Sequence, residues 1–262
     1  MPSPRVLVLR APGTNCDEET AYAFERAGAT TERVHVNRII DNPVLKDRYQ
    51  ILCVPGGFSY GDDIAAGRIL ATRLKKHHAD FIYTYVHGQR YRLVLGICNG
   101  MQVLMRLGVL TEDVAAAEGN QPATLTWNNH GRFEDRWVHL ATDQTNCVFL
   151  RGIDSMYLPM AHAEGKFVAQ NPAVLDELRG AGRLCLRYAR DAGSGVEDGP
   201  LEFPVNPNGA DANVAGVCDS TGRVLGLMPH PERHVDATQH PFWTRRQEQP
   251  PAGDGLAMFQ NA

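Results

Sequence analysis

A cysteine between two glycines gives this sequence its clearest chemical signal. In residues 96–100 (Gly-Ile-Cys-Asn-Gly), the thiol of Cys98 stands where a short apolar run at 92–95 passes into apolar residues at helical spacing. A nucleophile elbow holds its reactive side chain on such a strand-to-helix turn, and the first N–H groups of the helix favour a thiolate there. A cysteine with an ordinary pKa of about 8.5 is only slightly ionised at neutral pH, so a base is also needed. Cys98 is therefore a candidate nucleophile, the alternative being a small buried residue in a structural corner.

A histidine and a carboxylate follow another apolar run and could supply that base. His230 and Glu232 lie in Met-Pro-His-Pro-Glu-Arg at 228–233, directly after the run at 224–227. The two prolines favour an extended segment, in which side chains two residues apart point the same way. The imidazole would then take the thiol proton while the acid holds its tautomer and supports its charge. The pattern favours a triad of Cys98, His230 and Glu232 over a surface turn with an incidental histidine.

A glycine-rich loop after a third apolar run is suited to binding a developing negative charge. Residues 55–62 read Pro-Gly-Gly-Phe-Ser-Tyr-Gly-Asp and follow the run at 51–54. We expect the backbone N–H groups of Gly57 and Asn99 to form a two-donor oxyanion hole. A Gly-Gly pair alone is more often an ordinary turn, but its position at a strand end favours the functional interpretation. Gly56 and Phe58 of the same loop are candidate substrate contacts.

Longer blocks of the sequence resemble one enzyme family. From residue 5 to about 235 the chain resembles the glutaminase subunits of phosphoribosylformylglycinamidine synthases, which are class I glutamine amidotransferases of purine biosynthesis. The triad alone would imply only the general class, whereas the extended blocks carry the purine-specific resemblance. The matching blocks are 9–17, 56–62, 96–102, 206–209 and 230–233, and 254–259 resembles the end of the family. The chain departs from the family pattern at His130, where serine is expected, and at Ala163, where glycine is expected; both departures concern substrate contacts and partner docking.

The resemblance implies a reaction and a set of partners. Cys98 would attack the side-chain amide of glutamine, His230 would give a proton to the departing ammonia, and water would hydrolyse the glutamyl thioester. Ammonia would pass through a channel to a large synthetase subunit that uses ATP and magnesium to convert formylglycinamide ribonucleotide to its amidine, and a small third subunit would complete the complex. The sequence has no Gly-x-x-x-x-Gly-Lys-Ser/Thr loop, so we expect this chain to bind no cofactor itself.

Five further residues are candidates for contacts around the nucleophile. Gln102, one helical turn beyond it, would grip the amino or carboxylate end of glutamine together with Arg132 and Phe133. The alternatives are a solvated helix residue for Gln102 and a plain strand pair for the other two. His162 and Glu164 would contact the synthetase or line the ammonia exit, unless they form an inert surface pair.

Three other functions remain open at this point. An amidotransferase that serves a different synthetase would keep the triad but would not need residues 206–209. A cysteine peptidase, another cysteine hydrolase or a chaperone-like protein on the same fold would have no use for a glutamine pocket. A non-catalytic regulatory subunit would be expected to lack a triad residue, and all three are present in this sequence.

Composition excludes several classes of protein. Twenty-six Lys and Arg against thirty Asp and Glu give a formal charge of −4, so no basic surface indicates nucleic acid. No apolar run approaches the roughly 20 residues needed to cross a membrane, and no signal peptide is evident, so we expect a cytoplasmic location. The six cysteines lack paired spacing, which indicates reduced thiols. Neither Cys-x-x-Cys nor His-Glu-x-x-His occurs, so no metal site is predicted.

Alternating apolar runs and helical segments predict the architecture that positions these residues. Runs at 6–9, 34–36, 51–54 and 93–95 predict a mostly parallel central sheet flanked by helices, and the resemblance implies the flavodoxin-like fold of class I glutamine amidotransferases. We expect a helix over 18–27 with Asp17 as its N-cap, and one or two helices over 63–86. Beyond residue 110, alternation at 136–140 and again at 203–205 predicts added antiparallel strands. The expected organisation is one α/β domain over 1–262, with a core at about 5–235 and a C-terminal extension, 236–262, of unassigned role.

Overall fold

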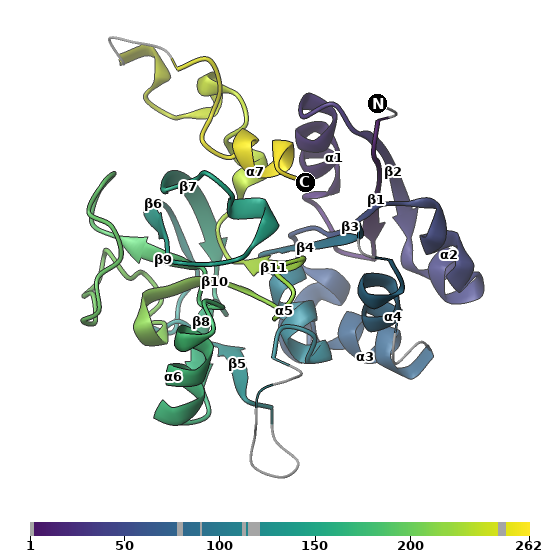
Figure 1. Ribbon diagram of the computed structural model, residues 1–262, viewed down its shortest axis with the longest axis horizontal. Helices are drawn as coiled ribbons and strands as arrows, with labels where there is room; N and C mark the ends of the chain where they lie inside the picture. The colour runs from purple at the N-terminus through teal and green to yellow at the C-terminus, as the bar shows by residue number, and fades with distance from the viewer. Residues whose placement is uncertain (1–2, 78–80, 90, 112–113, 115–120, 246–249) are drawn as a thin grey trace.

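A mixed sheet of nine strands forms the centre of the described protein (Figure 1). The structure is a computed structural model, described here for residues 3–77, 81–89, 91–111, 114, 121–245 and 250–262. Two further strands, β5 and β8, form a small antiparallel pair beside it. The strands are β1 (Arg5–Arg10), β2 (Thr30–His35), β3 (Ile51–Val54), β4 (Leu93–Ile97), β5 (Ala123–Thr126), β6 (Glu134–Thr142), β7 (Ser155–His162), β8 (Lys166–Ala169), β9 (Leu186–Ala189), β10 (Val214–Cys218) and β11 (Val224–Leu227).

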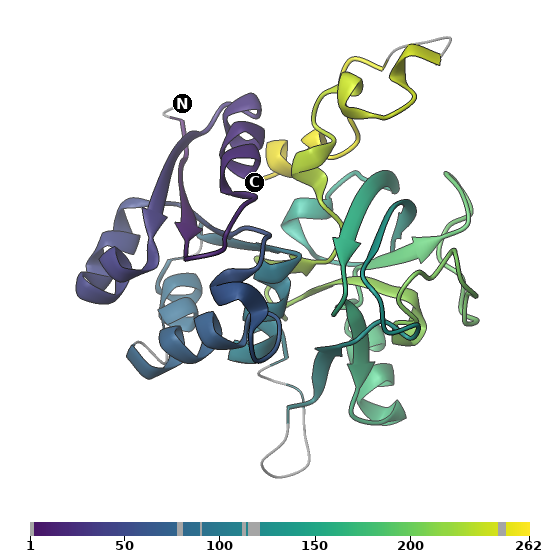
Figure 2. The ribbon, with the colours of Figure 1, turned by 180° about the vertical axis from the view of Figure 1, so that it is seen from behind.

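Helices cover both faces of one half of this sheet (Figure 2). In the two views α1 and α7 lie on one face, and α3, α4 and α5 lie on the other. The α-helices are α1 (Asp17–Arg26), α2 (Val36–Asp41), α3 (Arg68–His77), α4 (Phe81–Gly88), α5 (Asn99–Leu107), α6 (Pro172–Gly180) and α7 (Leu256–Gln260). Short 3₁₀ helices are η1 (Pro43–Arg48), η2 (Ser59–Asp62), η3 (Val148–Leu150), η4 (Asp211–Asn213), η5 (Pro231–Arg233), η6 (Ala237–Gln239) and η7 (Trp243–Arg245).

The sheet has a parallel half and an antiparallel half. Its order is β2-β1-β3-β4-β11-β10-β9-β6-β7, and the first five strands run parallel. Strands β3, β4 and β11 are buried along their whole length, as expected for parallel strands covered on both faces. From β10 onward each neighbour is antiparallel, and β7 alternates strictly between buried and half-buried residues. The prediction of a mostly parallel α/β core with added antiparallel strands is confirmed.

Two local expectations are wrong for identifiable reasons. Residues 203–205 form a turn and not a strand, because Pro204 has no N–H for a ladder and Asn206 holds the loop through its own side-chain hydrogen bonds. Helix α1 begins at Asp17, so Cys16 occupies the N-cap position without a side-chain cap bond. The Asp17 carboxylate instead pairs with Arg10 at 2.7 Å. The expected helices over 63–86 are present as α3 and α4.

The parallel strands bring three of the predicted motifs to one edge of the sheet. Because β3, β4 and β11 run in the same direction, the segments that follow them leave the sheet together. These segments are the glycine-rich loop, the elbow at Cys98 and the segment with His230. Within the described part of the chain, no helix has the length and hydropathy that crossing a bilayer requires.

Candidate active site

Cys98 occupies a strained turn between β4 and α5. Its backbone lies at φ 51° and ψ −105°, a positive φ that side chains disfavour, and its side chain is 6 % exposed. The flanking glycines are required by close packing, since a Cβ on Gly100 would lie 1.8 Å from the Val54 carbonyl oxygen. The Cys98 N–H donates to Leu227 O at 2.7 Å, and the thiol lies 3.6 Å from Ala161 O. The strand-to-helix elbow predicted at Cys98 is therefore present.

His230 and Glu232 form a buried pair in the next segment. The His230 Nδ1 lies 2.6 Å from Glu232 Oε1, and the two side chains are 2 % and 0 % exposed. The segment is a 3₁₀ turn beginning at Pro231, so the expectation of an extended segment is wrong although the two side chains still meet. Burial opposes protonation of His230, but Glu232 and Cys98 outweigh it and raise the pKa of the imidazole well above its usual value. The pair therefore favours an imidazolium beside a carboxylate.

The other nitrogen of His230 is available for chemistry. Among the described residues, its Nε2 is buried without a hydrogen-bond partner, and Cys98 is one of the groups that raise the pKa of the ring. Gly56 packs against the same imidazole, because a Cβ there would lie 2.8 Å from Cε1 of His230. The structure thus assigns Gly56 to close packing under the histidine, whereas the sequence suggested a substrate contact.

A second cysteine lies beside this pair, which the sequence interpretation missed. A sulfur of Cys16, a ring nitrogen of His230 and a carboxylate oxygen of Glu232 all lie within 4.8 Å of one another. The Arg233 guanidinium donates to Cys16 Sγ at 3.1 Å and to Glu19 Oε1 at 2.8 Å. Burial raises the pKa of the Cys16 thiol despite the opposing effect of His230. The only sequence signal for Cys16 was its place in the block at 9–17.

Gly57 and Asn99, the residues expected to supply the oxyanion donors, lie in two segments that a hydrogen bond joins. Gly57 has φ +132°, and a Cβ there would lie 2.7 Å from the backbone nitrogen of Asn15, so no other residue fits without a shift. Asn99 is the first residue of α5, where a backbone N–H has no partner within the helix. Its side-chain oxygen accepts a hydrogen bond from Ser59 N at 3.2 Å, and its amide donates to Asp62 Oδ1 at 3.1 Å. The Asn99 side chain therefore ties the glycine-rich loop to the elbow.

A cavity of about 180 Å³ opens above the nucleophile. Gln102 lines it but is buried, and both ends of its amide are engaged: Nε2 donates to Glu164 O at 2.7 Å and Oε1 accepts from Asn99 Nδ2 at 2.9 Å. The alternative of a solvated helix residue is wrong, and Gln102 holds the cavity wall. The lining residues are Gly57, Phe58, Asp62, Ala66, Cys98, Gln102, Trp127, Ala161, His162, Ala163 and Glu164.

His162 and Glu164 are part of this cavity and not an inert surface pair. His162 is buried, and its Nδ1 lies 3.2 Å from the amide oxygen of Asn128, an acceptor only, so Nδ1 carries the proton. Burial, followed by the charge of His230, lowers the pKa of His162 to about 3. Its Nε2 has no hydrogen-bond partner among the described residues and therefore offers a lone pair. Glu164 accepts from Ala66 N at 3.2 Å and lies 3.7 Å from Arg106.

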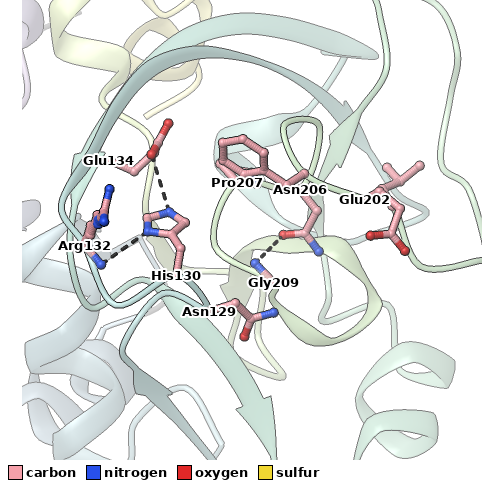
Figure 3. Close-up of a pocket in the computed structure, with 10 residues that line it drawn as sticks. Asn129, His130, Arg132, Glu134, Glu202, Asn206, Pro207 and Gly209 are labelled. Carbon is pink, nitrogen blue, oxygen red and sulfur yellow. Dashed lines mark hydrogen bonds and ion pairs between the residues drawn. The ribbon is translucent and has the colours of Figure 1, made fainter.

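Arg132 lies in a neighbouring pocket of about 500 Å³ and does not line the Cys98 cavity (Figure 3). His130 sits between Arg132, whose N–H donates to its Nδ1 at 3.2 Å, and Glu134, which lies 3.4 Å from its Nε2. Phe133 is half exposed, with its ring centroid 6.4 Å from that of Phe58. The structure therefore separates Arg132 from the nucleophile, and it places the Phe133 ring near Phe58, which lines the cavity.

The Asn-Pro-Asn-Gly motif at 206–209 supports the cavity from behind. The Asn206 side chain accepts from Gly209 N at 3.0 Å, which closes the turn seen in Figure 3. Asn208 is fully buried and donates to Gly165 O at 2.9 Å and to the Tyr188 hydroxyl at 3.1 Å. Gly165 in turn lies against the His162 ring, since a Cβ there would be 2.1 Å from its Cε1. This bracing role was not predicted from the motif.

Comparisons with known proteins agree on one family. A family model described as the CobB/CobQ-like glutamine amidotransferase domain matches residues 3–262. The chain is 43 % identical over 261 residues to phosphoribosylformylglycinamidine synthase subunit PurQ of Dehalococcoides mccartyi, covering 98 % of this chain and 96 % of that protein. It is 34 % identical to the human phosphoribosylformylglycinamidine synthase over 97 % of this chain and 19 % of the human one. A solved structure of PurLQS from Thermotoga maritima contains a chain with a TM-score of 0.72 and 29 % identity, with 99 % and 97 % of the two chains covered.

Proposed function

The chain belongs to the CobB/CobQ-like glutamine amidotransferase family, and we propose that it is the glutaminase subunit of a phosphoribosylformylglycinamidine synthase in purine biosynthesis. The relatives named as that synthase or its subunit PurQ match this chain along nearly its whole length, which supports the purine-specific assignment. The observation that carries the chemistry is the buried His230–Glu232 pair beside a cysteine held at positive φ.

The first half of the proposed reaction makes a thioester. The Cys98 sulfur attacks the side-chain amide carbon of glutamine, and the carbonyl oxygen becomes negatively charged. Backbone N–H groups of Gly57 and Asn99 bind that oxygen, an interaction worth about 3 to 4 kcal/mol per donor in comparable sites. His230, held by Glu232, passes the proton to the amide nitrogen, so that the C–N bond breaks and ammonia leaves.

The second half restores the enzyme. Neutral His230 takes a proton from water, the resulting hydroxide attacks the thioester carbon, and glutamate leaves as the Cys98 sulfur is released. We assign His162 to ammonia or the substrate amide, because its unpaired Nε2 lines the cavity and its low pKa keeps it a neutral acceptor. Phe58, Trp127 and Phe133 would form the mouth through which glutamine enters, since each is exposed.

Ammonia released here requires a consumer. The proposal includes a large synthetase subunit that receives it, and the solved PurLQS structure supports a partnership of this kind. ATP and magnesium would bind to that subunit, and a small third subunit would complete a cytoplasmic complex. The human relative supports a link between this chain and a synthetase, because this chain matches 19 % of one longer protein that is named as the whole synthase.

The size of the cavity favours a glutaminase over a cysteine peptidase. At about 180 Å³ it is below the roughly 300–1,000 Å³ of pockets for drug-sized molecules. A free amino acid suits such a space, whereas a peptidase must also admit chain on both sides of the scissile bond. A glutamine amidotransferase of a different synthetase would share the cavity, so the acceptor has to be tested directly.

The test reconstitutes this chain with a large synthetase subunit, formylglycinamide ribonucleotide and ATP, and measures amidine formation from glutamine or from free ammonium. We expect Cys98→Ala to abolish the glutamine-dependent reaction and to leave the ammonium-dependent one intact, because the thiol is needed only to make ammonia. Cys185→Ala, which removes a buried thiol beside β9 in the antiparallel half of the sheet, is the matched control. Glutamine-dependent synthesis by Cys98→Ala would refute the thioester mechanism, and failure of the wild-type pair to use this acceptor would refute the purine assignment.

A further inference from the structure

Three cysteines far apart in the sequence meet inside the antiparallel half. Cys147 directly precedes η3, Cys185 directly precedes β9, and Cys218 ends β10. All three are buried free thiols, and their sulfur atoms lie within 4.8 Å of one another. Two contacts with backbone carbonyl groups are weak, at 3.6 Å from Cys185 Sγ to Gly216 O and 3.9 Å from Cys218 Sγ to Gly182 O.

The arrangement is close to the geometry of a tetrahedral zinc site. Zinc bound by thiolates at about 2.3 Å places neighbouring sulfurs about 3.8 Å apart, so the three sulfurs need to move inward by no more than about 1 Å. The hydroxyl of Thr145 lies 3.6 Å from Cys218 Sγ. An oxygen at about 2.1 Å from the same zinc would lie about 3.6 Å from each sulfur, so this hydroxyl has the separation from Cys218 that a fourth ligand needs.

The charge around the cluster also suits a divalent ion. Three thiolates and a zinc ion carry a net charge of −1. The buried Arg183 provides a compensating positive charge: its Nε donates to Cys218 O at 3.2 Å, and its guanidinium acts on the Cys218 thiol electrostatically. This positive charge beside Cys218 would offset the net negative charge of a zinc ion with three thiolates.

An entry path lies next to the cluster. A surface pocket of about 620 Å³ is lined by Cys147 together with Thr145 and Asn146. The backbone N–H of Cys147 donates to the Thr145 hydroxyl at 3.1 Å, so one short segment contributes a sulfur, the candidate oxygen and the pocket wall. A metal ion could reach the sulfurs from this side after a small movement of the 145–147 segment.

We propose that Cys147, Cys185 and Cys218 bind one zinc ion. Soft thiolate ligands select zinc over magnesium, calcium or manganese. The ion would join the loop before η3 to the ends of β9 and β10, and so stabilise the antiparallel half. It lies outside the cavity of Cys98, and it replaces the expectation from sequence spacing that the chain has no metal site.

The test measures metal binding by the reduced full-length chain under anaerobic conditions. Cadmium serves as a spectroscopic substitute for zinc, and its thiolate charge-transfer absorbance counts the bound sulfurs. We expect one cadmium per chain with three thiolates, displacement by zinc in competition with a chelating dye, and a higher melting temperature with zinc than without it. Cys218→Ser should weaken zinc binding by at least tenfold, and Cys147→Ala should do the same if Cys218→Ser fails to fold.

Matched controls locate the ion. Cys16→Ala removes a sulfur that lies near two other possible metal ligands, the side chains of His230 and Glu232. Cys53→Ala removes a buried thiol that belongs to neither group of possible ligands. Both variants should bind zinc as the wild type does. Loss of binding in Cys16→Ala would move the ion to the active site and overturn the proposal. The proposal would also be overturned if the wild-type chain bound no zinc, or if its mass were lower by two hydrogens because of a disulfide within the cluster. None of these measurements depends on glutaminase activity, so they test the zinc site independently of the proposed function.

Discussion

Cysteines in the two halves of the sheet have similar burial but different neighbours. At the edge of the parallel half, Cys98 and Cys16 lie near an imidazole paired with a carboxylate. In the antiparallel half, Cys147, Cys185 and Cys218 lie near one another. All are buried and free. Burial therefore does not distinguish a nucleophilic thiol from a structural one. The neighbouring groups do, since one is an imidazole paired with a carboxylate and the others are thiols.

Backbone geometry distinguishes the two regions as well. Cys98 is the one cysteine among the described residues with a positive φ, and the glycines around it allow backbone atoms to come close. The three clustered cysteines lie at the end of β10, directly before β9 and directly before η3, without such strain. Strain at Cys98 is consistent with a side chain held where a reaction needs it, and its absence in the cluster is consistent with a role in stability.

Replacing the imidazole should give the largest difference between the regions. We expect His230→Gln to lower kcat for glutamine hydrolysis by about 10³- to 10⁴-fold, because it removes both the base and the acid of the reaction. Cys185→Ala, in the other region, should change kcat by less than about twofold. Steady-state assays of both variants in the reconstituted complex make the comparison. A similar loss in Cys185→Ala would show that the two regions are not functionally separate.

Removing the acid should have a smaller but still large effect. Glu232→Gln keeps the shape of the side chain but removes the charge that supports His230, and we expect a loss of about 100-fold or more in kcat. The pKa of His230 should fall, since Glu232 is the strongest of the groups that raise it. NMR titration of the His230 ring and steady-state kinetics measure the two effects. Unchanged turnover would mean that the acid of the triad lies elsewhere.

Cys16 should matter through its neighbours and not as a nucleophile. Its sulfur accepts a hydrogen bond from Arg233 at 3.1 Å, and Cys16→Ala would leave that donor unpaired beside the triad. The loss of such a bond corresponds to about 3- to 10-fold in kcat, with KM little changed. Cys16→Ser, which restores an acceptor, should recover most of the activity. If the alanine variant instead lost all activity, Cys16 would have a direct chemical role.

The remaining prediction concerns stability at acid pH and not turnover. Burial lowers the pKa of His162 to about 3, whereas an unfolded histidine titrates near 6.5. Below about pH 6.5 the unfolded chain binds a proton that the folded chain refuses, so the free energy of unfolding decreases as the pH falls. By pH 5 the loss is about 2 kcal/mol. His162→Gln keeps a donor for Asn128 and should flatten the stability curve between pH 7 and 5 by that amount, as measured by denaturant unfolding.

Local patterns were sufficient to predict the parallel core and the candidate triad. A strand, a glycine-flanked cysteine and a helix are contiguous in the sequence, and the helix predicted after Cys98 is present as α5. Cys16 and the three-cysteine cluster could not be found in this way, because their partners are brought together only by the fold. Arg132 shows the converse limit: nearness in sequence to Phe133 did not place both side chains in one cavity.

The contact between Gly100 and Val54 has an evolutionary consequence. At this point helix α5 and strand β3 touch through main-chain atoms, since even a methyl group on Gly100 would overlap the Val54 carbonyl. The spacing between the elbow and the glycine-rich loop is therefore set by this main-chain contact at Gly100, not by the size of core side chains. Core side chains can therefore change in size while the reacting groups keep their separation.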